Sequence, residues 1–111
     1  MMRCVILESP YAGDVDANVA YARRCVRDCV LRGEAPIASH LLFTQAGILD
    51  DNVPAERALG IDAGLAWLIL AEAMVLYIDR GMSPGMQAAM KEAQRMGVPT
   101  ELRALEPMEL G

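Results

Sequence analysis

Apolar runs alternate along the chain with longer amphipathic segments, and turn-forming residues separate them. The runs 4–7 and 73–78 are continuously apolar, which is typical of strands buried on both faces of a parallel sheet. Two further strands are predicted at 34–38 and 98–104. Pro36 has no amide proton to donate, so its strand is expected at a sheet edge or with the proline at its start.

The segments between these runs have the spacing of helices. A helix is predicted from Asp14 or Asp16 to about Leu31, a short one from His40, and a long one from Pro54 to about Leu70. A last helix is predicted from 86 to 96. One face of the long helix is expected to hold Leu59, Ala63, Ala66, Trp67 and Leu70.

Strands that alternate with helices predict a small doubly wound α/β domain with a parallel sheet, and the expected strand order is 2-1-3-4. The domain is predicted to span residues 1–105, followed by a tail at 106–111. Ligands bind such folds beyond the carboxyl ends of the strands, where the strand order reverses. Four segments are expected to meet there: residues 8–16, 39–43, 79–86 and those after 104.

Composition narrows the class of protein. The 111 residues are 54% hydrophobic, enough for a core, and the formal net charge is −5, which disfavours nucleic-acid binding through phosphates. The apolar stretch 61–78 is interrupted by Asp62 and Glu72, so no membrane partner is expected. The first apolar run is too short for a signal peptide, and three cysteines cannot all pair. These features together predict a cytoplasmic protein.

Two loops have the chemistry of anion sites at helix starts. One follows the first strand and contains Ser9, Pro10 and Tyr11. The other follows the third strand, where Ser83 can cap the next helix, Pro84 fits its first turn, and Gly85 and Met86 complete the motif. Each loop also has a purely structural interpretation, as a tight turn or a well-capped helix. Neither a GxGxxG nor a GxxxxGK[ST] pattern is present, and no cofactor is expected.

Two ionisable residues are candidate catalytic groups. His40, which is the only histidine, directly follows the second strand and can contact a ligand or transfer a proton. Asp62 lies between Gly60 and Gly64 on the long helix and must face water, a partner subunit or a ligand. Zinc binding by His40 with Cys25 and Cys29 is possible in principle, but buried thiols are the favoured interpretation and no metal site is predicted.

Several motifs occur in an order that resembles a widespread family of small phage and bacterial proteins of unassigned function. The resemblance runs from Val5 to about Arg103. Its segments are Ser9-Pro10-Tyr11, Asn18 with Ala22, 36–43, 49–52, Glu56-Arg57, Gly60, Gly64, Ser83-x-Gly85-Met86, Ala93 and 97–99.

That family is similar in turn to nucleoside 2-deoxyribosyltransferases and nucleotide N-glycosidases. The resemblance implies a flavodoxin-like sheet, a nucleoside or nucleotide pocket, and a homodimer or higher homo-oligomer. In those enzymes a glutamate four residues beyond the glycine of the SxG motif attacks the anomeric carbon. The corresponding residue is Ala89, which has no carboxylate, and Glu92 lies nearly a full helical turn further on.

Three functions follow as alternatives. The first is a nucleotide-binding protein that binds through Ser9, Pro10, Tyr11, His40 and 83–86, without the usual nucleophile. The second is an active deoxyribosyltransferase or N-glycosidase that uses Asp62, Glu8 or Asp79 instead. The third is a non-catalytic homo-oligomeric interaction protein, with an interface around Leu65, Trp67 and Leu68.

Overall fold

The computed structural model of the chain describes residues 1–106, so most of the predicted tail lies outside the described residues. Four parallel strands form one sheet in the order β2-β1-β3-β4. They are β1 (Arg3–Glu8), β2 (Glu34–Ile37), β3 (Ala73–Tyr77) and β4 (Thr100–Arg103). The doubly wound parallel sheet and its predicted strand order are confirmed, and Pro36 lies in the edge strand β2 as its missing amide proton requires.

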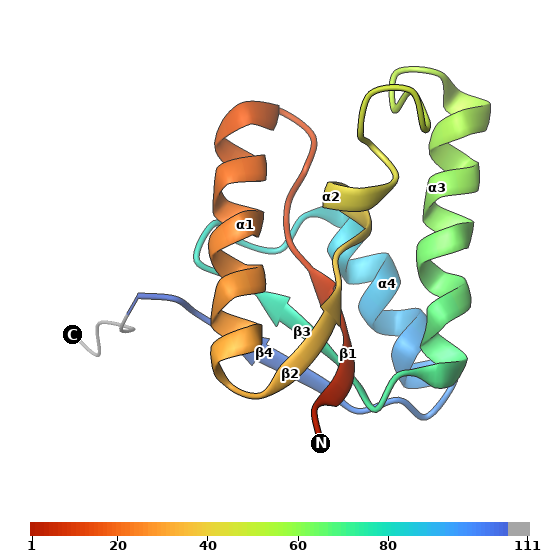
Figure 1. Cartoon of the computed structure of the whole chain (residues 1–111). Coiled ribbons are helices and arrows are strands. Elements are labelled where there is room, and N and C mark those ends of the chain that lie inside the picture. Colours follow the sequence, from red (N-terminus) through yellow and green to blue (C-terminus); the bar gives the residue numbers. More distant parts are fainter. Residues whose placement is uncertain (107–111) are drawn as a thin grey trace.

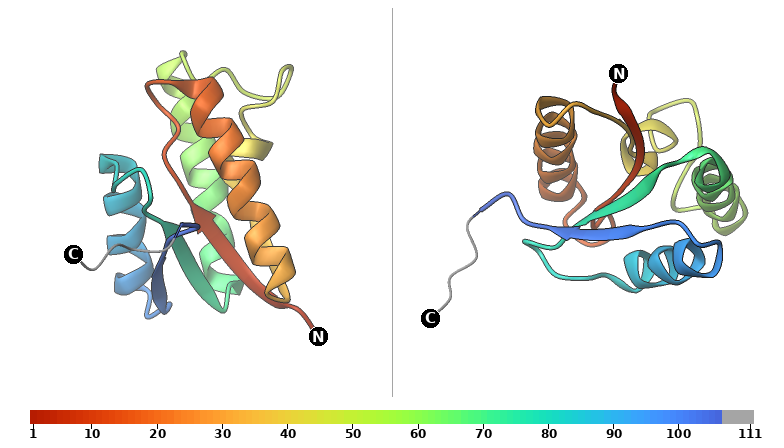
Figure 2. Two further views of the ribbon diagram at one scale, coloured as in Figure 1. Left: turned by 90° about the vertical axis from the view of Figure 1, so that its left-hand side faces the viewer. Right: turned by 90° about the horizontal axis from the view of Figure 1, so that it is seen from below.

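The helices cover both faces of the sheet (Figures 1 and 2). Helix α1 (Val15–Leu31) lies on one face. The other face carries α3 (Pro54–Ala66), the 3-10 turn η1 (Trp67–Leu70) and α4 (Pro84–Arg95), and the short α2 (Ser39–Leu42) follows β2. No helix within the first 106 residues has both the length and the apolar character needed to cross a bilayer.

Alternate residues of β1 divide the core between these two faces. Val5 and Leu7 pack with Tyr21 and the buried Cys25 and Cys29 under α1. On the other face the core cluster is made by Ile6, Leu68, Met74, Leu76, Met86, Ala89 and Ala93. Glu8 continues the alternation of β1, so it lies on the α3 and α4 face at the carboxyl end of the strand.

The long helix differs from its prediction in length and in the face it buries. It ends at Ala66, and the 3-10 turn that follows carries Leu68 fully into the core. The predicted face is therefore wrong, because Leu59, Trp67 and Leu70 are 59%, 44% and 69% exposed. The tighter winding of the 3-10 turn changes the directions of the side chains at 67–70 from those of a continuous α-helix. Leu59 lies before this turn, in the part of α3 that packs through Gly60 and Gly64 instead.

Candidate functional site

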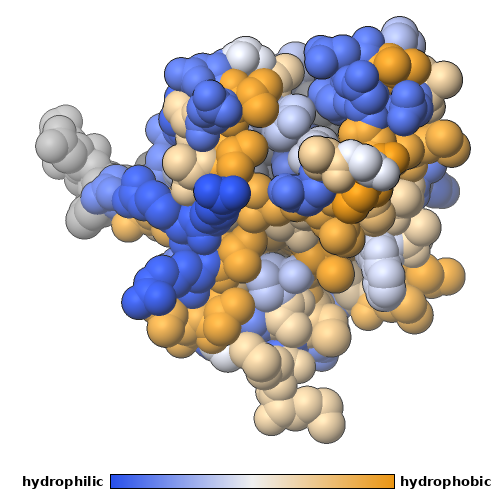
Figure 3. Space-filling model, turned by 45° about the horizontal axis from the view of Figure 1, so that its top comes forward, coloured by the Kyte–Doolittle hydropathy of each residue, from blue (hydrophilic) through white to orange (hydrophobic). Residues whose placement is uncertain are grey.

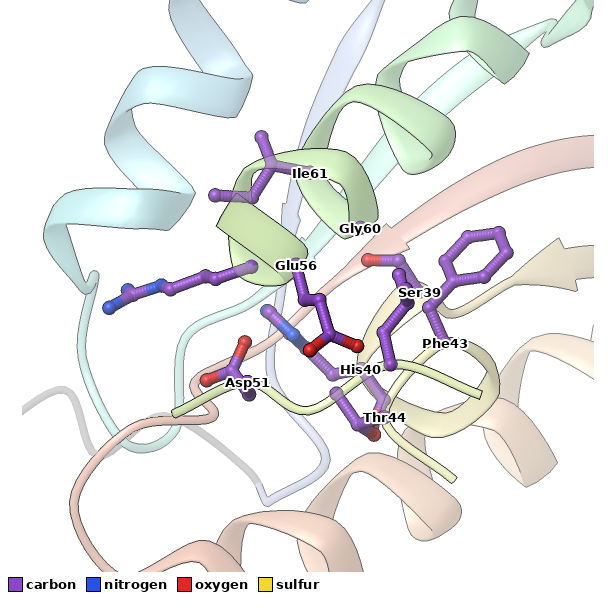
Figure 4. A pocket seen from close by; sticks show the side chains of 10 residues that line it. Ser39, His40, Phe43, Thr44, Asp51, Glu56, Gly60 and Ile61 are labelled. Atoms are coloured by element: carbon purple, nitrogen blue, oxygen red, sulfur yellow. The ribbon is translucent and has the colours of Figure 1, made fainter. Parts of the chain in front are cut away.

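A hollow opens at the carboxyl edge of the sheet, between α2, the loop that precedes α3, and the first turns of α3. Its lining residues are Ser39, His40, Phe43, Thr44, Leu49, Asp51, Glu56, Arg57, Gly60 and Ile61. The side chains of His40, Asp51 and Glu56 converge on this space (Figure 4). A wider and more open depression adjoins it, reaches Tyr11, and shares Thr44, Leu49, Asp51 and Glu56 with it.

Close packing of α2 against α3 forms one wall of the hollow. A Cβ atom on Gly64 would lie 3.0 Å from the Cβ atom of Ser39, and one on Gly60 would lie 3.4 Å from the Cδ1 atom of Leu49. Because Gly60 and Gly64 have no side chains, α2 and the loop after it can pack closely against α3. The two glycines, four residues apart on one helix face, are a sequence signal for this contact.

The loop after β1 is held in place from α1. Asp14 caps α1 by accepting a hydrogen bond from the amide of Ala17. The buried Asn18 side chain donates hydrogen bonds to the carbonyl oxygens of Tyr11 and Ala12, at 2.9 and 3.1 Å. Tyr11 therefore has a fixed position at the carboxyl end of β1.

His40 stacks on Tyr11. The two ring centroids are 5.1 Å apart and the ring planes differ by 18°. Burial lowers the pKa of His40, the nearby Asp51 carboxylate opposes that shift, and the Arg57 charge adds to it. The imidazole is thus neutral near pH 7. His40 lines the hollow and Tyr11 lines the depression that adjoins it.

The polar lining of the hollow is mainly acidic. The Glu56 carboxylate accepts a hydrogen bond from the backbone amide of Asp50 at 3.2 Å. The Thr44 hydroxyl donates a hydrogen bond to the backbone carbonyl of His40 at 2.6 Å. Figure 3 shows hydrophilic side chains gathered over the loop that precedes α3, with apolar surface beside them. Asp51, Glu56 and Arg57 line the hollow, and Asp50 lines the depression that adjoins it.

The predicted motif at the start of α4 folds as its residue types indicate. Ser83 is the N-cap and accepts a hydrogen bond from the amide of Met86 at 3.2 Å, Pro84 begins the helix, and Gly85 is exposed. This segment follows β3 and Tyr11 follows β1, so both leave the same edge of the sheet. Within the described chain, however, none of residues 83–86 lines either hollow.

The other residues singled out from the sequence are placed in three different settings. Asp62 is exposed and lines neither hollow, although its neighbours Gly60 and Ile61 line one. Ala89 is buried in the core cluster under α4. The alternative of a zinc site at His40, Cys25 and Cys29 gains no support. Cys25 and Cys29 are buried under α1, and nowhere in residues 1–106 do three His, Cys, Asp or Glu side chains lie close enough together to hold a metal ion.

Asp79 has a structural role. Its carboxylate accepts a hydrogen bond from the Tyr21 hydroxyl at 2.6 Å and from the amides of Leu105 and Glu106 at 2.9 to 3.0 Å. Burial acts to raise the pKa of Asp79, but these hydrogen bonds outweigh burial and lower it. The carboxylate therefore joins α1 to the segment that follows β4.

Sequence reasoning missed much of the hollow. The lining from Thr44 to Ile61 lies outside the segments that the sequence predicts to meet at the site. The predicted binding residues Ser9 and Pro10 line neither of the two hollows, and Ser9 is buried.

The fold and the position of the hollow define the class of protein: a parallel α/β domain with its candidate site at the carboxyl edge of the sheet. The chain belongs to the family described as a domain of unknown function, DUF7768, whose model matches residues 3–103. No curated protein sequence matches it.

Among solved structures, the chain is similar to a 2-deoxyribosyltransferase from the psychrotolerant bacterium Bacillus psychrosaccharolyticus. The TM-score is 0.65 and the sequence identity is 18%, over 96% of this chain and 77% of that one. At this identity the similarity establishes the deoxyribosyltransferase-like fold.

Proposed function

We propose that this protein binds a nucleoside in the wider depression that reaches Tyr11, together with the smaller hollow that adjoins it between α2 and the start of α3. The observation that carries the proposal is the stacked Tyr11 and His40 pair at the carboxyl edge of a parallel sheet. A nucleobase has a π face that stacks on aromatic rings, and such stacking contributes about 1–3 kcal/mol per base. The similarity in fold to a 2-deoxyribosyltransferase supports the same ligand class.

The acidic lining favours a sugar over a phosphate next to the aromatic pair. Carboxylates of Asp51 and Glu56 can accept hydrogen bonds from sugar hydroxyl groups. The same carboxylates would repel a phosphate placed beside them, since like charges at short range raise the energy. A nucleotide would therefore have to direct its phosphate away from them, toward the start of α4 at Ser83 and Gly85, and nucleosides are the preferred ligands.

The absence of a carboxylate at Ala89 supports binding without the usual covalent route. Ala89 is 6% exposed and packs in the core cluster with Met86. An alanine side chain cannot attack an anomeric carbon. Any glycosidic chemistry must then come from a carboxylate on another element.

Calorimetric titration tests the proposal with nucleosides and their 5′-monophosphates. We expect nucleosides to bind, with affinity reduced at least tenfold by Asp51→Asn and by His40→Ala. Asp62→Asn is the matched control, because it removes an exposed carboxylate of α3 outside the hollow, and it should leave affinity unchanged. Absence of binding at millimolar concentration by every nucleoside and nucleotide would contradict the proposal.

We also propose that the protein self-associates through the outer surface of α3 and η1. Leu59, Trp67, Ile69 and Leu70 expose 44 to 76% of their surface there, and large exposed apolar groups of this kind mark interfaces. Leu68, which was expected in this interface, is instead fully buried in the core. Light scattering that gives the mass of a single chain at all concentrations would refute self-association.

A further inference from the structure

The two adjoining openings differ greatly in size. The depression that reaches Tyr11 has a volume of about 540 Å³, whereas the hollow between α2 and α3 has a volume of about 30 Å³. Sites for small organic molecules usually have roughly 300–1,000 Å³, so the depression can hold the body of a nucleoside. A cavity needs roughly 10–15 Å³ to hold one water molecule, so only one small group of the ligand fits in the hollow.

The walls of the hollow suit an apolar group. Phe43, Leu49 and Ile61 contribute to a lining that is mostly apolar, whereas the lining of the depression is mostly polar. The Thr44 hydroxyl is already engaged, because it donates to the backbone carbonyl of His40 at 2.6 Å. A hydroxyl or phosphate group that entered this space would exchange its hydrogen bonds to water for contacts with carbon, which is unfavourable.

Gly60 keeps the hollow open. A Cβ atom at this position would lie 3.4 Å from the Cδ1 atom of Leu49 and 3.9 Å from the Cβ atom of Phe43, and both residues line the hollow. These are ordinary contact distances, in contrast to the 3.0 Å between Ser39 and a Cβ atom on Gly64. The φ angle of Gly60 is not positive, so its backbone does not require a glycine either. Since glycine is less favourable than alanine inside a helix, what its presence at position 60 provides is the open space.

We propose that the hollow is a selectivity pocket for a methyl group on the base of the bound nucleoside, and that Gly60 sets this selectivity. The inference rests on the proposed function and names the class of nucleoside. The base is the part of the ligand that can present such a group, because the sugar is covered with hydroxyl groups. The base ring then lies in the depression near Tyr11, with its methyl group in the hollow. Asp51 and Glu56 line both openings, so their carboxylates remain available to sugar hydroxyl groups where the openings join.

The size of the effect follows from the burial of one methyl group. An apolar pocket distinguishes ligands that differ by one methylene group by roughly 10- to 200-fold. An alanine at position 60 would place its own methyl group against Leu49 and Phe43, in the space that the methyl group of the ligand needs. The substitution should therefore remove the preference for the methylated ligand and leave the binding of the unmethylated one in place.

The test compares nucleosides that differ only by a methyl group on the base. The pairs are thymidine with 2′-deoxyuridine, 5-methyl-2′-deoxycytidine with 2′-deoxycytidine, and N6-methyl-2′-deoxyadenosine with 2′-deoxyadenosine. Calorimetry should show that the wild type binds the methylated member at least about tenfold more tightly in one or more pairs. Gly60→Ala should bind both members of that pair equally, with the affinity that the wild type has for the unmethylated one. Ala58→Leu adds bulk to an exposed position of α3 outside both openings and should keep the wild-type preference.

The outcomes separate the two proposals. Equal affinities within all three pairs for the wild type, or a methyl preference that Gly60→Ala leaves unchanged, would overturn the selectivity pocket and leave nucleoside binding intact. Failure of the wild type to bind any nucleoside would overturn both. Gly60→Ala is expected to stabilise α3, so a lost preference would not come from unfolding, and a thermal unfolding curve of each variant confirms that it is folded.

Discussion

Arg103 of β4 forms a two-pronged ion pair with Glu34 of β2, with N–O distances of 2.6 and 2.7 Å. The two strands are opposite edges of the sheet, and both side chains are largely buried, at 8% and 6% exposure. Arg103 also donates to Glu101, and hydrogen bonds to Glu34 are the main cause that raises the pKa of Arg103 above its usual value. This ion pair therefore links the two edge strands of the sheet that carries the site.

Arg103→Met is expected to destabilise the protein by about 3 kcal/mol, because it leaves Glu34 buried with only the more distant Arg3 as a counter-charge. Adding Glu34→Leu should recover most of that loss, since the unpaired charge is then gone. Urea unfolding measures both effects. Arg95→Met, which breaks an exposed ion pair with Glu92, is the control and should cost much less stability than Arg103→Met. Equal losses in the two arginine variants would contradict this account.

Stability should fall as the pH rises past the ordinary pKa of Glu8. Burial raises this pKa from 4.5 to about 7, so the folded state holds a proton that the unfolded state releases between those values. The unfolding free energy of the wild type should therefore decrease relative to Glu8→Gln, by about 3 kcal/mol in total from pH 4.5 to above 7.

Denaturant unfolding at several pH values from about 4.5 to 8 measures the difference between wild type and Glu8→Gln. Glu92→Gln is the control, because Arg95 lowers the pKa of the exposed Glu92 and its titration falls below this range. A constant difference between wild type and Glu8→Gln across the range would mean that Glu8 titrates normally.

Asn18→Ala should weaken both the fold and ligand binding. The buried amide group fixes the carbonyl oxygens of Tyr11 and Ala12, and its loss leaves both without their partner, at a cost of about 1–3 kcal/mol. Tyr11 then loses its fixed position under His40, and nucleoside affinity should drop severalfold. Gln87→Ala removes an exposed amide from α4 and should change neither quantity. Unaltered affinity in Asn18→Ala would show that the loop needs no anchoring.

Gly60→Ala and Gly64→Ala should change the stability of the protein by different amounts, or in opposite directions, although both replace a glycine inside α3. Alanine in a helix interior is favoured over glycine by about 1 kcal/mol. Position 60 has ordinary contacts and should show much of that gain, whereas position 64 places a Cβ atom 3.0 Å from Ser39 and should lose it. Thermal unfolding of the two variants checks this expectation, and a gain at position 64 equal to that at position 60 would argue against tight packing of α2 on α3.

Most of the fold could be predicted because each strand and helix carries a local signal. The apolar run before Glu8, the capping residues Asp14 and Ser83, and the proline at the start of α3 act over a few residues, and the structure confirms them. The strand order was predictable from the same elements, because it places the two most apolar strands, β1 and β3, in the centre of the sheet, where both of their faces are covered.

The hollow could be predicted only in part because it depends on contacts between distant segments. Residues 44–57 have no periodic pattern, and the role of Asp51 and Glu56 appears only when the loop folds against α2. The sequence also predicted one helix up to about Leu70, because the change to a 3-10 turn at Trp67 leaves no separate mark in the sequence. Glu8 was identified as a possible acid, but its lack of a partner is a tertiary property.

Chemical-shift mapping of the ¹⁵N-labelled protein during titration with a nucleoside tests the central claim most directly. The account predicts saturable shifts at Tyr11, at Ser39 to Thr44 and around Asp51, and their loss in His40→Ala. Residues of β4 and of the outer surface of α1 should keep their positions. Shifts confined to other surfaces, or no shifts at millimolar nucleoside, would contradict a nucleoside site at this edge of the sheet.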